Sequence, residues 1–242
     1  NNYSMSFDGS DDYINNTSNL PLILNGDFCI QGWWYKATAS SNNPFWCIGD
    51  VKTGGLELYV GDGGTVTKVY HADSTRIVAA FNPTVASWHH YSVVRESGIV
   101  KLYIDGIQDP TTWNSTATFS GDLNIGQEIY NGSNSYNAWC DGFIDNFEIW
   151  DIALTEQEIQ QYMNCPPTGN ESGLVGYWNF EEGSGNTVLD LTSNGNHGTI
   201  YGATYSSNVP SQSCNLTNVN GCDSTAILNL TINYPTQGGS SI

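Results

Sequence analysis

Acidic side chains are the groups in this sequence best able to do chemistry, since Asp and Glu outnumber Lys and Arg by 24 to 6. Asp8, Asp11 and Asp12 fall within five consecutive positions, and Asp145 adds a carboxylate from a later apolar segment. Calcium prefers six to eight oxygen ligands from carboxylates and carbonyls, so these four residues are candidate calcium ligands. The alternative is that Asp8 and Asp145 cap turns and accept hydrogen bonds from backbone amides.

Two pairs of adjacent residues raise the question of acid–base catalysis. Glu181 and Glu182 are neighbours, so on a strand they would point to opposite faces and could not share one substrate. His89 and His90 could supply a general base, or they could belong to a strand of the core. We expect that the protein is not an enzyme.

Aromatic side chains are a second source of binding chemistry, because they make up 12% of the chain and can stack on pyranose faces. Most of them must fill a core between sheets. The candidates for ligand contact lie in segments that read as loops, namely Trp113, Tyr130, Tyr136 and Trp139. Each could instead anchor its loop.

Six cysteines favour an oxidising compartment, although six reduced and buried thiols are the alternative. The absence of a C-x-x-C pair and the presence of only four His leave little support for a zinc or thioredoxin-like site. Cys29 and Cys47 lie on two predicted strands joined by a short loop, where facing positions come within disulfide reach. Cys165 and Cys214, which flank a later β-rich segment, are the second predicted pair.

Short apolar segments between clusters of Gly, Asn, Asp and Ser must position these side chains. Such a pattern is typical of a β-sandwich or barrel. The segment 99–104 ends at Asp105-Gly106, a strong hairpin signal. The clearest predicted strands are residues 3–7, 28–36, 45–48, 55–60, 88–95, 99–104, 123–125, 143–150 and 174–180.

One helix is predicted after Leu154. Thr155 and Glu158 have the spacing of a capping box, in which each side chain accepts a hydrogen bond from the other residue's backbone amide. Pro166 and Pro167 prevent the helix from continuing.

The composition changes along the chain and suggests four segments. We expect a domain over residues 1–164, a linker over 165–172 and further strands over 173–209. We expect residues 210–242 to be a C-terminal extension or the start of a next repeat. Their part 214–242 is rich in Asn, Thr and Ser and is too short to bury a core alone.

The charge balance excludes several classes of partner. A net charge of −18 with six Lys and Arg cannot neutralise many phosphates, which excludes nucleic acid. An anionic membrane would repel the chain, and no apolar run approaches the ~18 residues needed for membrane insertion. No signal peptide opens the chain, so we expect a mature piece of a secreted or cell-surface protein.

Six segments resemble, in order, the laminin-G-like jelly-roll domains of the concanavalin A-like lectin superfamily. They are residues 6–13, 27–33, 88–95, 100–106, 123–126 and 142–150. The resemblance implies an all-β, two-sheet antiparallel jelly-roll sandwich with one short helix. It also implies that His89 and His90 mark a strand entering the sandwich, and that Asp145 helps to hold a structural ion near the first hairpin.

Residues 126–128 also resemble the pentraxins. However, Ile129 and Tyr130 stand where that family places further oxygen ligands, so its double-calcium site for phosphocholine is not carried over. The Glu-x-Asp-x-x-Glu motif of related glycoside hydrolases and the repeats of related sialidases are absent as well.

Residues 173–185 and 190–199 resemble the first strands of the same family, which normally precede the first hairpin. We therefore expect residues 173–209 to complete the jelly roll in permuted order, rather than to join a neighbouring domain, because an unpaired sheet edge favours aggregation. Residues 221–225 resemble repeats of large surface proteins of Bacteroidetes-type bacteria.

These features predict a non-catalytic extracellular binding or adhesion module. Its expected partner is a glycan or glycoprotein surface, together with neighbouring modules of the same long chain. The alternative is a structural spacer in a cell-surface or filament protein.

Overall fold

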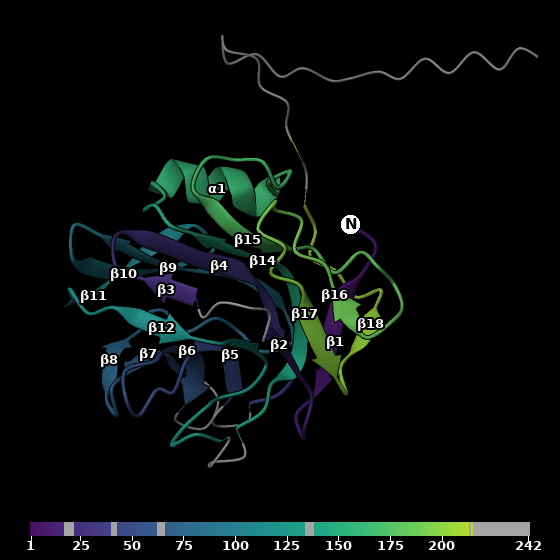
Figure 1. Cartoon of the computed structure of the whole chain (residues 1–242), viewed down its shortest axis with the longest axis horizontal. Helices are drawn as coiled ribbons and strands as arrows, with labels where there is room; N and C mark the ends of the chain where they lie inside the picture. Colours follow the sequence, from purple (N-terminus) through teal and green to yellow (C-terminus); the bar gives the residue numbers. More distant parts are fainter. Residues whose placement is uncertain (17–21, 40–42, 62–65, 134–137, 213, 215–242) are drawn as a thin grey trace, which may run out of the picture.

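The computed structural model describes residues 1–16, 22–39, 43–61, 66–133, 138–212 and 214. Within them, two large antiparallel sheets face each other, and an α-helix lies on the outside of one sheet (Figure 1). This arrangement confirms the predicted jelly-roll sandwich.

The first sheet lies under the helix and is called here the helix-side sheet. Its strand β15 (Leu174–Trp178) pairs with β14 outside the main path. Along that path the order is β11 (Ile107–Asn114), β10 (Ile99–Ile104), β9 (Trp88–Glu96), β4 (Phe28–Lys36), β14 (Asp141–Trp150), β1 (Ser4–Asp8) and β18 (Thr204–Ser206).

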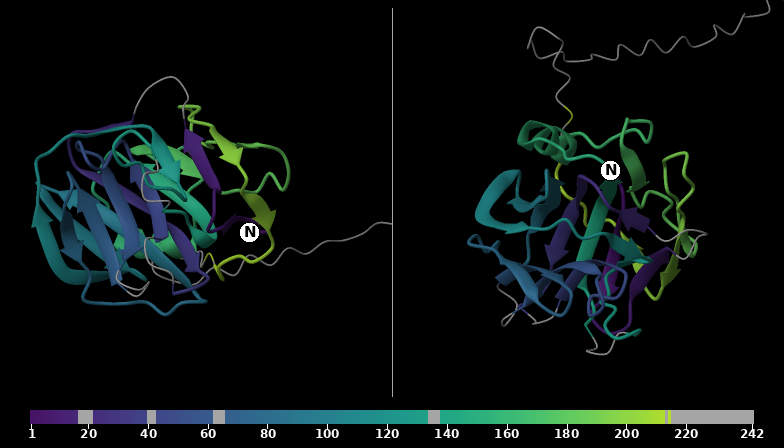
Figure 2. Two further views of the ribbon diagram at one scale, coloured as in Figure 1. Left: turned by 90° about the horizontal axis from the view of Figure 1, so that it is seen from below. Right: turned by 60° about the vertical axis from the view of Figure 1, so that its left-hand side comes forward.

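The second sheet has an outer face without a helix and is called here the open sheet; Figure 2 (left) shows it from that side. A separate short pair joins β12 (Phe119–Gly121) to β3 (Leu22–Leu24). The order in the open sheet is β16 (Thr187–Val188), β17 (Gly198–Tyr201), β2 (Tyr13–Asn16), β13 (Leu123–Ile125), β5 (Asn43–Ile48), β6 (Leu56–Gly61), β7 (Val66–His71) and β8 (Thr75–Val78).

Large apolar side chains fill the space between the sheets, because alternate residues of each strand point inward. Trp34 of β4 stacks on Phe45 of β5, with ring centroids 5.2 Å apart, and so joins the two layers. Phe147 of β14 packs edge-on against the same Phe45 ring. All three side chains are at most 1% exposed.

The helix α1 (Glu156–Asn164) begins as the sequence predicts. Thr155 is its N-cap, and the reciprocal hydrogen bonds of the capping box with Glu158 are both present. Ile159 of the helix packs with Leu154, Trp150 and Cys29 on the outer face of the helix-side sheet. This smaller cluster is separate from the core between the sheets.

Residues after the helix pair with strands of both sheets. β15 lies beside β14, with Trp178 opposite Phe147, and β18 lies beside β1. β17 lies beside β2, with Tyr201 opposite Tyr13. The predicted division of the chain into four segments stays a prediction.

One of the two predicted disulfides is present in the structure and the other is not. Cys165 and Cys214 form a disulfide. Cys29 and Cys47 are free thiols, so the predicted bridge between them is wrong. The reason is that β4 and β5 belong to opposite sheets, and both thiols point away from the space between them. Cys29 packs under the helix, while the Cys47 thiol donates to the Gly49 carbonyl at 3.0 Å.

Candidate functional site

A row of polar side chains crosses the outer face of the open sheet. Asn15 of β2 lies opposite Asn124 of β13, which lies opposite Cys47 of β5, and Cys47 lies opposite Glu57 of β6. The residues that alternate with this row, such as Ile14 and Trp46, belong to the core. Strand periodicity therefore places the whole row on one face.

A groove of about 440 Å³ lies where this row reaches β2 and β17, next to the edge strand β16. Polar side chains and two tyrosines dominate its lining. The lining residues are Tyr13, Asn15, Gly49, Asp50, Asp122, Asn124, Gln127, Ile129, Gly132 and Tyr201.

Asp50 fixes one wall of the groove. Its Oδ1 accepts hydrogen bonds from the amides of Lys52 and Asn131, and its Oδ2 accepts one from the amide of Gly132 at 2.7 Å. The same loop is held from the other side by Tyr130, whose hydroxyl donates to Asp73 at 2.6 Å. The wall is thus set by backbone amides that donate to the Asp50 carboxylate and by the side-chain contact of Tyr130 with Asp73.

Two tyrosines form the opposite wall. The rings of Tyr13 and Tyr201 stack with centroids 4.4 Å apart and planes 9° from parallel, as a cross-strand pair of β2 and β17. The Trp139 ring also lies near Tyr13, with ring centroids 5.9 Å apart. Tyr201 is 43% exposed, so part of its ring stays open to a ligand.

Amide side chains form the floor. Asn124 Oδ1 accepts hydrogen bonds from Asn15 Nδ2 at 2.7 Å and from Gln127 Nε2 at 2.9 Å. The Asn124 Nδ2 in turn donates to the Asp122 carbonyl at 3.3 Å. Because each amide is tied to its neighbour, the floor is preorganised.

Two buried carboxyls lie beside the groove without lining it. Glu57 is 2% exposed and Glu128 is 9% exposed. Burial, and then the charge of Glu128, raises the pKa of Glu57 well above its ordinary value. Burial, and then the charge of Asp50, raises the pKa of Glu128 to about 7. The sequence alone does not predict this pair, because its members are far apart in the chain.

Of the four aromatic residues predicted to contact a ligand, those that the structure describes do not form one site. Trp113 packs against the core, with its ring 5.2 Å from His71 and beside Phe119. Tyr130 anchors its loop through Asp73, as described above. Trp139 lies beside the groove tyrosines, and Tyr136 lies outside the described residues. The groove tyrosines themselves were not predicted, since they sit in strands rather than loops.

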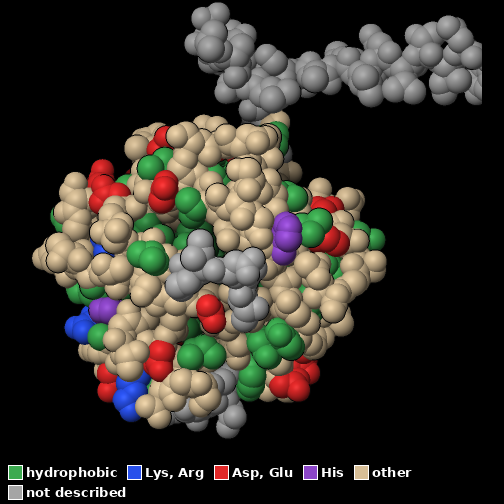
Figure 3. All heavy atoms as spheres, in the orientation of Figure 1, with side chains coloured by type: hydrophobic (Ala, Val, Ile, Leu, Met, Phe, Trp, Pro, Cys, Tyr) green, Lys and Arg blue, Asp and Glu red, His purple; other side chains and the backbone are tan. Residues whose placement is uncertain are grey.

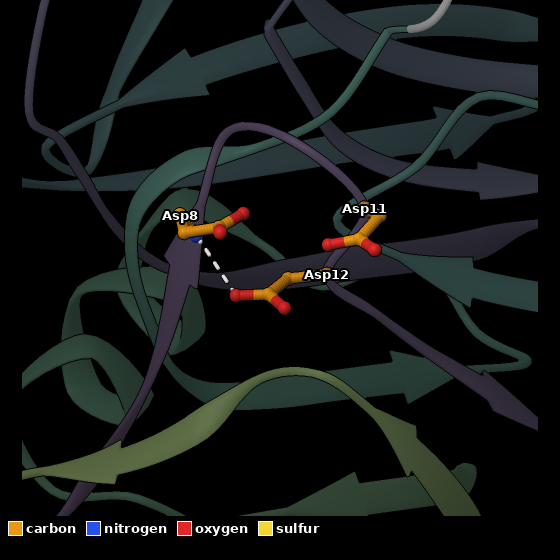
Figure 4. Close-up of side chains that lie close together, drawn as sticks. All are labelled: Asp8, Asp11 and Asp12. Atoms are coloured by element: carbon orange, nitrogen blue, oxygen red, sulfur yellow. Dashed lines mark hydrogen bonds between the residues drawn. The ribbon is translucent and has the colours of Figure 1, made fainter.

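The β1–β2 turn brings three of the four predicted calcium ligands together. Carboxylate oxygens of Asp8, Asp11 and Asp12 lie within 4.8 Å of one another, and Figure 4 shows the three side chains converging. Asp12 Oδ2 accepts a hydrogen bond from the Asp8 amide at 2.9 Å. Burial raises the pKa of Asp12, and the charges of Asp8 and Asp11 add to the effect.

The donor set of this turn fits a hard cation, because it consists of carboxylate oxygens at an accessible position. The turn also adjoins the groove wall. Asp12 immediately precedes Tyr13, and Gly202 immediately follows Tyr201. A Cβ at Gly202 would lie only 2.0 Å from Asp12 Oδ1, and the backbone φ of Gly202 is +76°. The two turns are therefore packed against each other at this point.

Asp145 lies apart from that turn. It follows Ile144, which pairs with Met5, so it stands about four strand residues, or roughly 13 Å, from Asp8. Its carboxylate accepts hydrogen bonds from Asn1 Nδ2 and from the Asn146 amide, both at 2.8 Å. Burial raises the pKa of Asp145 to about 8.

His89, Glu181 and Glu182 make local contacts within the fold, and His90 is buried. His89 Nδ1 lies 2.8 Å from Asp105, and burial lowers the pKa of His90 to about 3. Glu181 accepts hydrogen bonds from the amides of Asn2 and Tyr3, and Glu182 accepts one from the amide of Leu189.

Comparison with known proteins places the fold in a family. A laminin-G-like family model, described as the concanavalin A-like lectin/glucanases superfamily, matches residues 8–160. The chain belongs to this superfamily. No curated protein sequence matches the chain.

Two solved structures resemble this chain in fold. A candidate carbohydrate-binding protein from Bacteroides ovatus is 17% identical, with a TM-score of 0.70, over 88% of this chain and 62% of that one. A heptameric SAP-like pentraxin from Limulus polyphemus is 18% identical, with a TM-score of 0.57, over 80% of this chain and 96% of that one. This chain thus spans 62% of the length of the Bacteroides protein.

No helix in the described part of the chain is long and apolar enough to cross a membrane.

Proposed function

We propose that the chain is a non-catalytic, extracellular glycan-binding module and that the groove beside Tyr13 and Tyr201 is its binding site. The observation that carries the proposal is the combination of a partly open tyrosine pair with a fixed amide floor. Sugar recognition commonly joins an aromatic face to a few placed polar groups in a concave site. The superfamily match and the name of the Bacteroides protein support the same ligand class.

Burial of the carboxyl pair supports binding rather than hydrolysis. A glycosidase needs two carboxyl groups that flank the scissile bond and contact the substrate. Glu57 and Glu128 are almost fully buried, and neither lines the groove. Asp50 and Asp122 are the carboxyl residues among the described lining residues, and the Asp50 carboxylate is already engaged by three backbone amides, so a sugar in the groove would not lie between two free carboxyls.

The first prediction concerns the tyrosine wall. Replacing Tyr201 by Ala removes the exposed ring and is expected to weaken glycan binding about tenfold, since aromatic contacts of this kind contribute about 0.5–1.5 kcal/mol beyond their buried area. The matched control is Tyr3→Ala. Tyr3 is 38% exposed, does not line the groove and should leave affinity unchanged.

The measurement is a glycan array with the whole chain, followed by calorimetric titration of each hit. Binding that survives Tyr201→Ala at full strength would place the ligand elsewhere. Silence across the array would favour the alternative function, a structural spacer between neighbouring modules of a long surface protein.

We further propose that the β1–β2 turn binds calcium through Asp8, Asp11 and Asp12. A cation there would offset the repulsion among the three carboxylates. Binding to the native state alone stabilises it by roughly 2.7 kcal/mol at a hundredfold excess over the dissociation constant. For a chain of this size, that is a rise in Tm of roughly 5–10 °C.

The second prediction is therefore a calcium-dependent Tm. Thermal melts in chelator, in magnesium and in calcium at equal ionic strength separate a specific site from charge screening. Asp11→Asn should abolish the calcium shift, whereas Asp145→Asn, on a carboxyl far from the turn, should retain it. Equal shifts in magnesium and calcium, or a full shift in Asp11→Asn, would remove the turn from consideration.

A further inference from the structure

The groove has an unusual balance of hydrogen-bonding groups. Asn124 Oδ1 is engaged by two amide donors, but Asn15 Oδ1 and Gln127 Oε1 accept no hydrogen bond from a described residue. In the described part of the chain, the fully buried side-chain atoms without partners are nitrogens of Trp34, Lys36 and Trp46. The free amide oxygens of Asn15 and Gln127 therefore face accessible space.

Asp122 adds a charged acceptor to the lining. Its carboxylate makes no hydrogen bond to a described residue, although its backbone carbonyl accepts one from Asn124. Asp50, on the wall, supplies a second carboxylate. The groove thus offers oxygen acceptors from both floor and wall.

Positive charge is missing from the same place. Among the described lining residues there is no Lys and no Arg. Lys52, on the Asp50 side, donates to Asn131 Oδ1 at 3.2 Å and lies over the Tyr130 ring. In Figure 3 the Lys and Arg side chains of the visible face gather at its left edge.

A ligand in this groove must therefore bring hydrogen-bond donors. Sugar hydroxyls can donate, and an ammonium group donates while carrying a charge of the favoured sign. Carboxylate and sulfate groups only accept, so they would meet acceptors of like charge and lose their hydration without replacement.

Resting on the proposed glycan-binding function, we infer that the groove selects neutral and amine-bearing sugars and rejects sugars that carry carboxylate or sulfate groups. Asp122 is the specificity-determining residue of this selection. Asp122 is exposed and lies two residues before Asn124, so strand alternation puts its side chain on the same face as the amide floor, whereas the Asp50 carboxylate is used to hold the wall.

The test compares three sets of oligosaccharides on the whole chain. The sets are neutral gluco-, galacto-, manno- and arabino-oligosaccharides, chitosan oligosaccharides as the amine-bearing set, and oligogalacturonates with chondroitin sulfate fragments as the anionic set. We expect measurable binding in the neutral or amine-bearing set and at least tenfold weaker binding in the anionic set. Raising the salt concentration should reduce an amine preference, because the charges are partly exposed.

Two variants make the inference specific to Asp122. Asp122→Asn keeps the shape and should lower chitosan affinity by about twofold to fivefold while leaving neutral sugars unchanged. Asp122→Lys should raise affinity for the anionic set by about fivefold or more. The control is Asp151→Lys, which changes the net charge equally at an exposed residue that does not line the groove.

The outcomes separate the inference from the function on which it rests. Anionic sugars that bind as tightly as neutral ones, with binding still lost in Tyr201→Ala, would overturn the charge selection and leave glycan binding in place. An equal gain for Asp122→Lys and Asp151→Lys would overturn the role of Asp122. Absence of binding in all three sets would overturn both the proposed function and this inference.

Discussion

The two outer faces of the sandwich carry similar networks of polar side chains, but α1 buries one network and the other borders a groove. On the helix-side sheet, Glu148 accepts hydrogen bonds from Gln31 at 2.7 Å and from the Trp150 indole at 2.9 Å, and α1 packs over this region. Glu148 and Gln31 are at most 1% exposed. On the open sheet, the amides of Asn15, Asn124 and Gln127 form a comparable network, but a groove remains beside them.

The difference shows that a polar network can bind a ligand only where no helix or loop buries it. Burial under the helix raises the pKa of Glu148, and no ligand can reach its carboxyl. The side-chain amides of Asn15 and Gln127 line the groove and keep oxygen acceptors free, so they can contact a ligand. The same alternation of side chains along strands produces both situations.

The largest expected effect comes from removing the segment that contributes to both faces. Deleting residues 173–214 takes away β15 beside β14 and β17 beside β2, and with them Tyr177 and Tyr201. We predict loss of the cooperative thermal transition and an insoluble or molten product, measured by calorimetry and near-UV circular dichroism. A truncated chain with an unchanged Tm would show that the segment does not complete this sandwich.

An intermediate effect is expected on the sealed face. Burial raises the pKa of Glu148 to about 8 from an ordinary value of 4.5, so the folded state binds the proton more tightly than the unfolded state. The favourable contribution is complete below pH 4.5 and is lost as the pH rises through 8. Glu148→Gln keeps an acceptor for both donors, and we predict a gain of a few kcal/mol at pH 9 and almost none at pH 4.

Urea unfolding at the two pH values measures this difference. Asp151→Asn, at an exposed carboxyl, is the matched control against which the Glu148→Gln difference is measured. A stability gain of equal size at both pH values would mean that packing, rather than ionisation, separates Glu148 from Gln.

The smallest effect distinguishes two tryptophans that look alike in the sequence. Trp113 packs against Phe119 at the core, so Trp113→Phe should lower stability by about 1 kcal/mol and leave glycan affinity unchanged. Trp139 supports Tyr13, so Trp139→Phe should weaken glycan binding about twofold with a smaller loss of stability. Matched melts and titrations of both variants check the contrast, which the reverse pattern would contradict.

Local signals in the sequence predicted much of the fold. The strands Phe28–Lys36 and Ile99–Ile104 and the capping box at Thr155 follow from periodicity and side-chain chemistry within a few residues. The pairing of Cys29 with Cys47 failed because a short connection between two strands does not tell whether they pair or cross between sheets. β2 and β17 carry no comparable local signal.

The candidate site was harder to predict than the fold. Tyr13 and Tyr201 come together only because β17 pairs with β2, a contact between residues far apart in the chain. Glu57 and Glu128 approach each other for a similar reason, across the open sheet and its covering loop. The Asp8, Asp11 and Asp12 cluster could be predicted because a single turn contains it.

The hydrogen bond from Trp150 to Glu148 gives the molecule a built-in optical reporter. An indole that donates to a carboxyl experiences a different electric field when that carboxyl gains a negative charge, and its absorption and emission shift accordingly. Trp150 is 1% exposed, so solvent quenchers do not reach it directly. The near-ultraviolet spectrum should therefore follow the titration of Glu148, and the amplitude lost in Glu148→Gln identifies the signal.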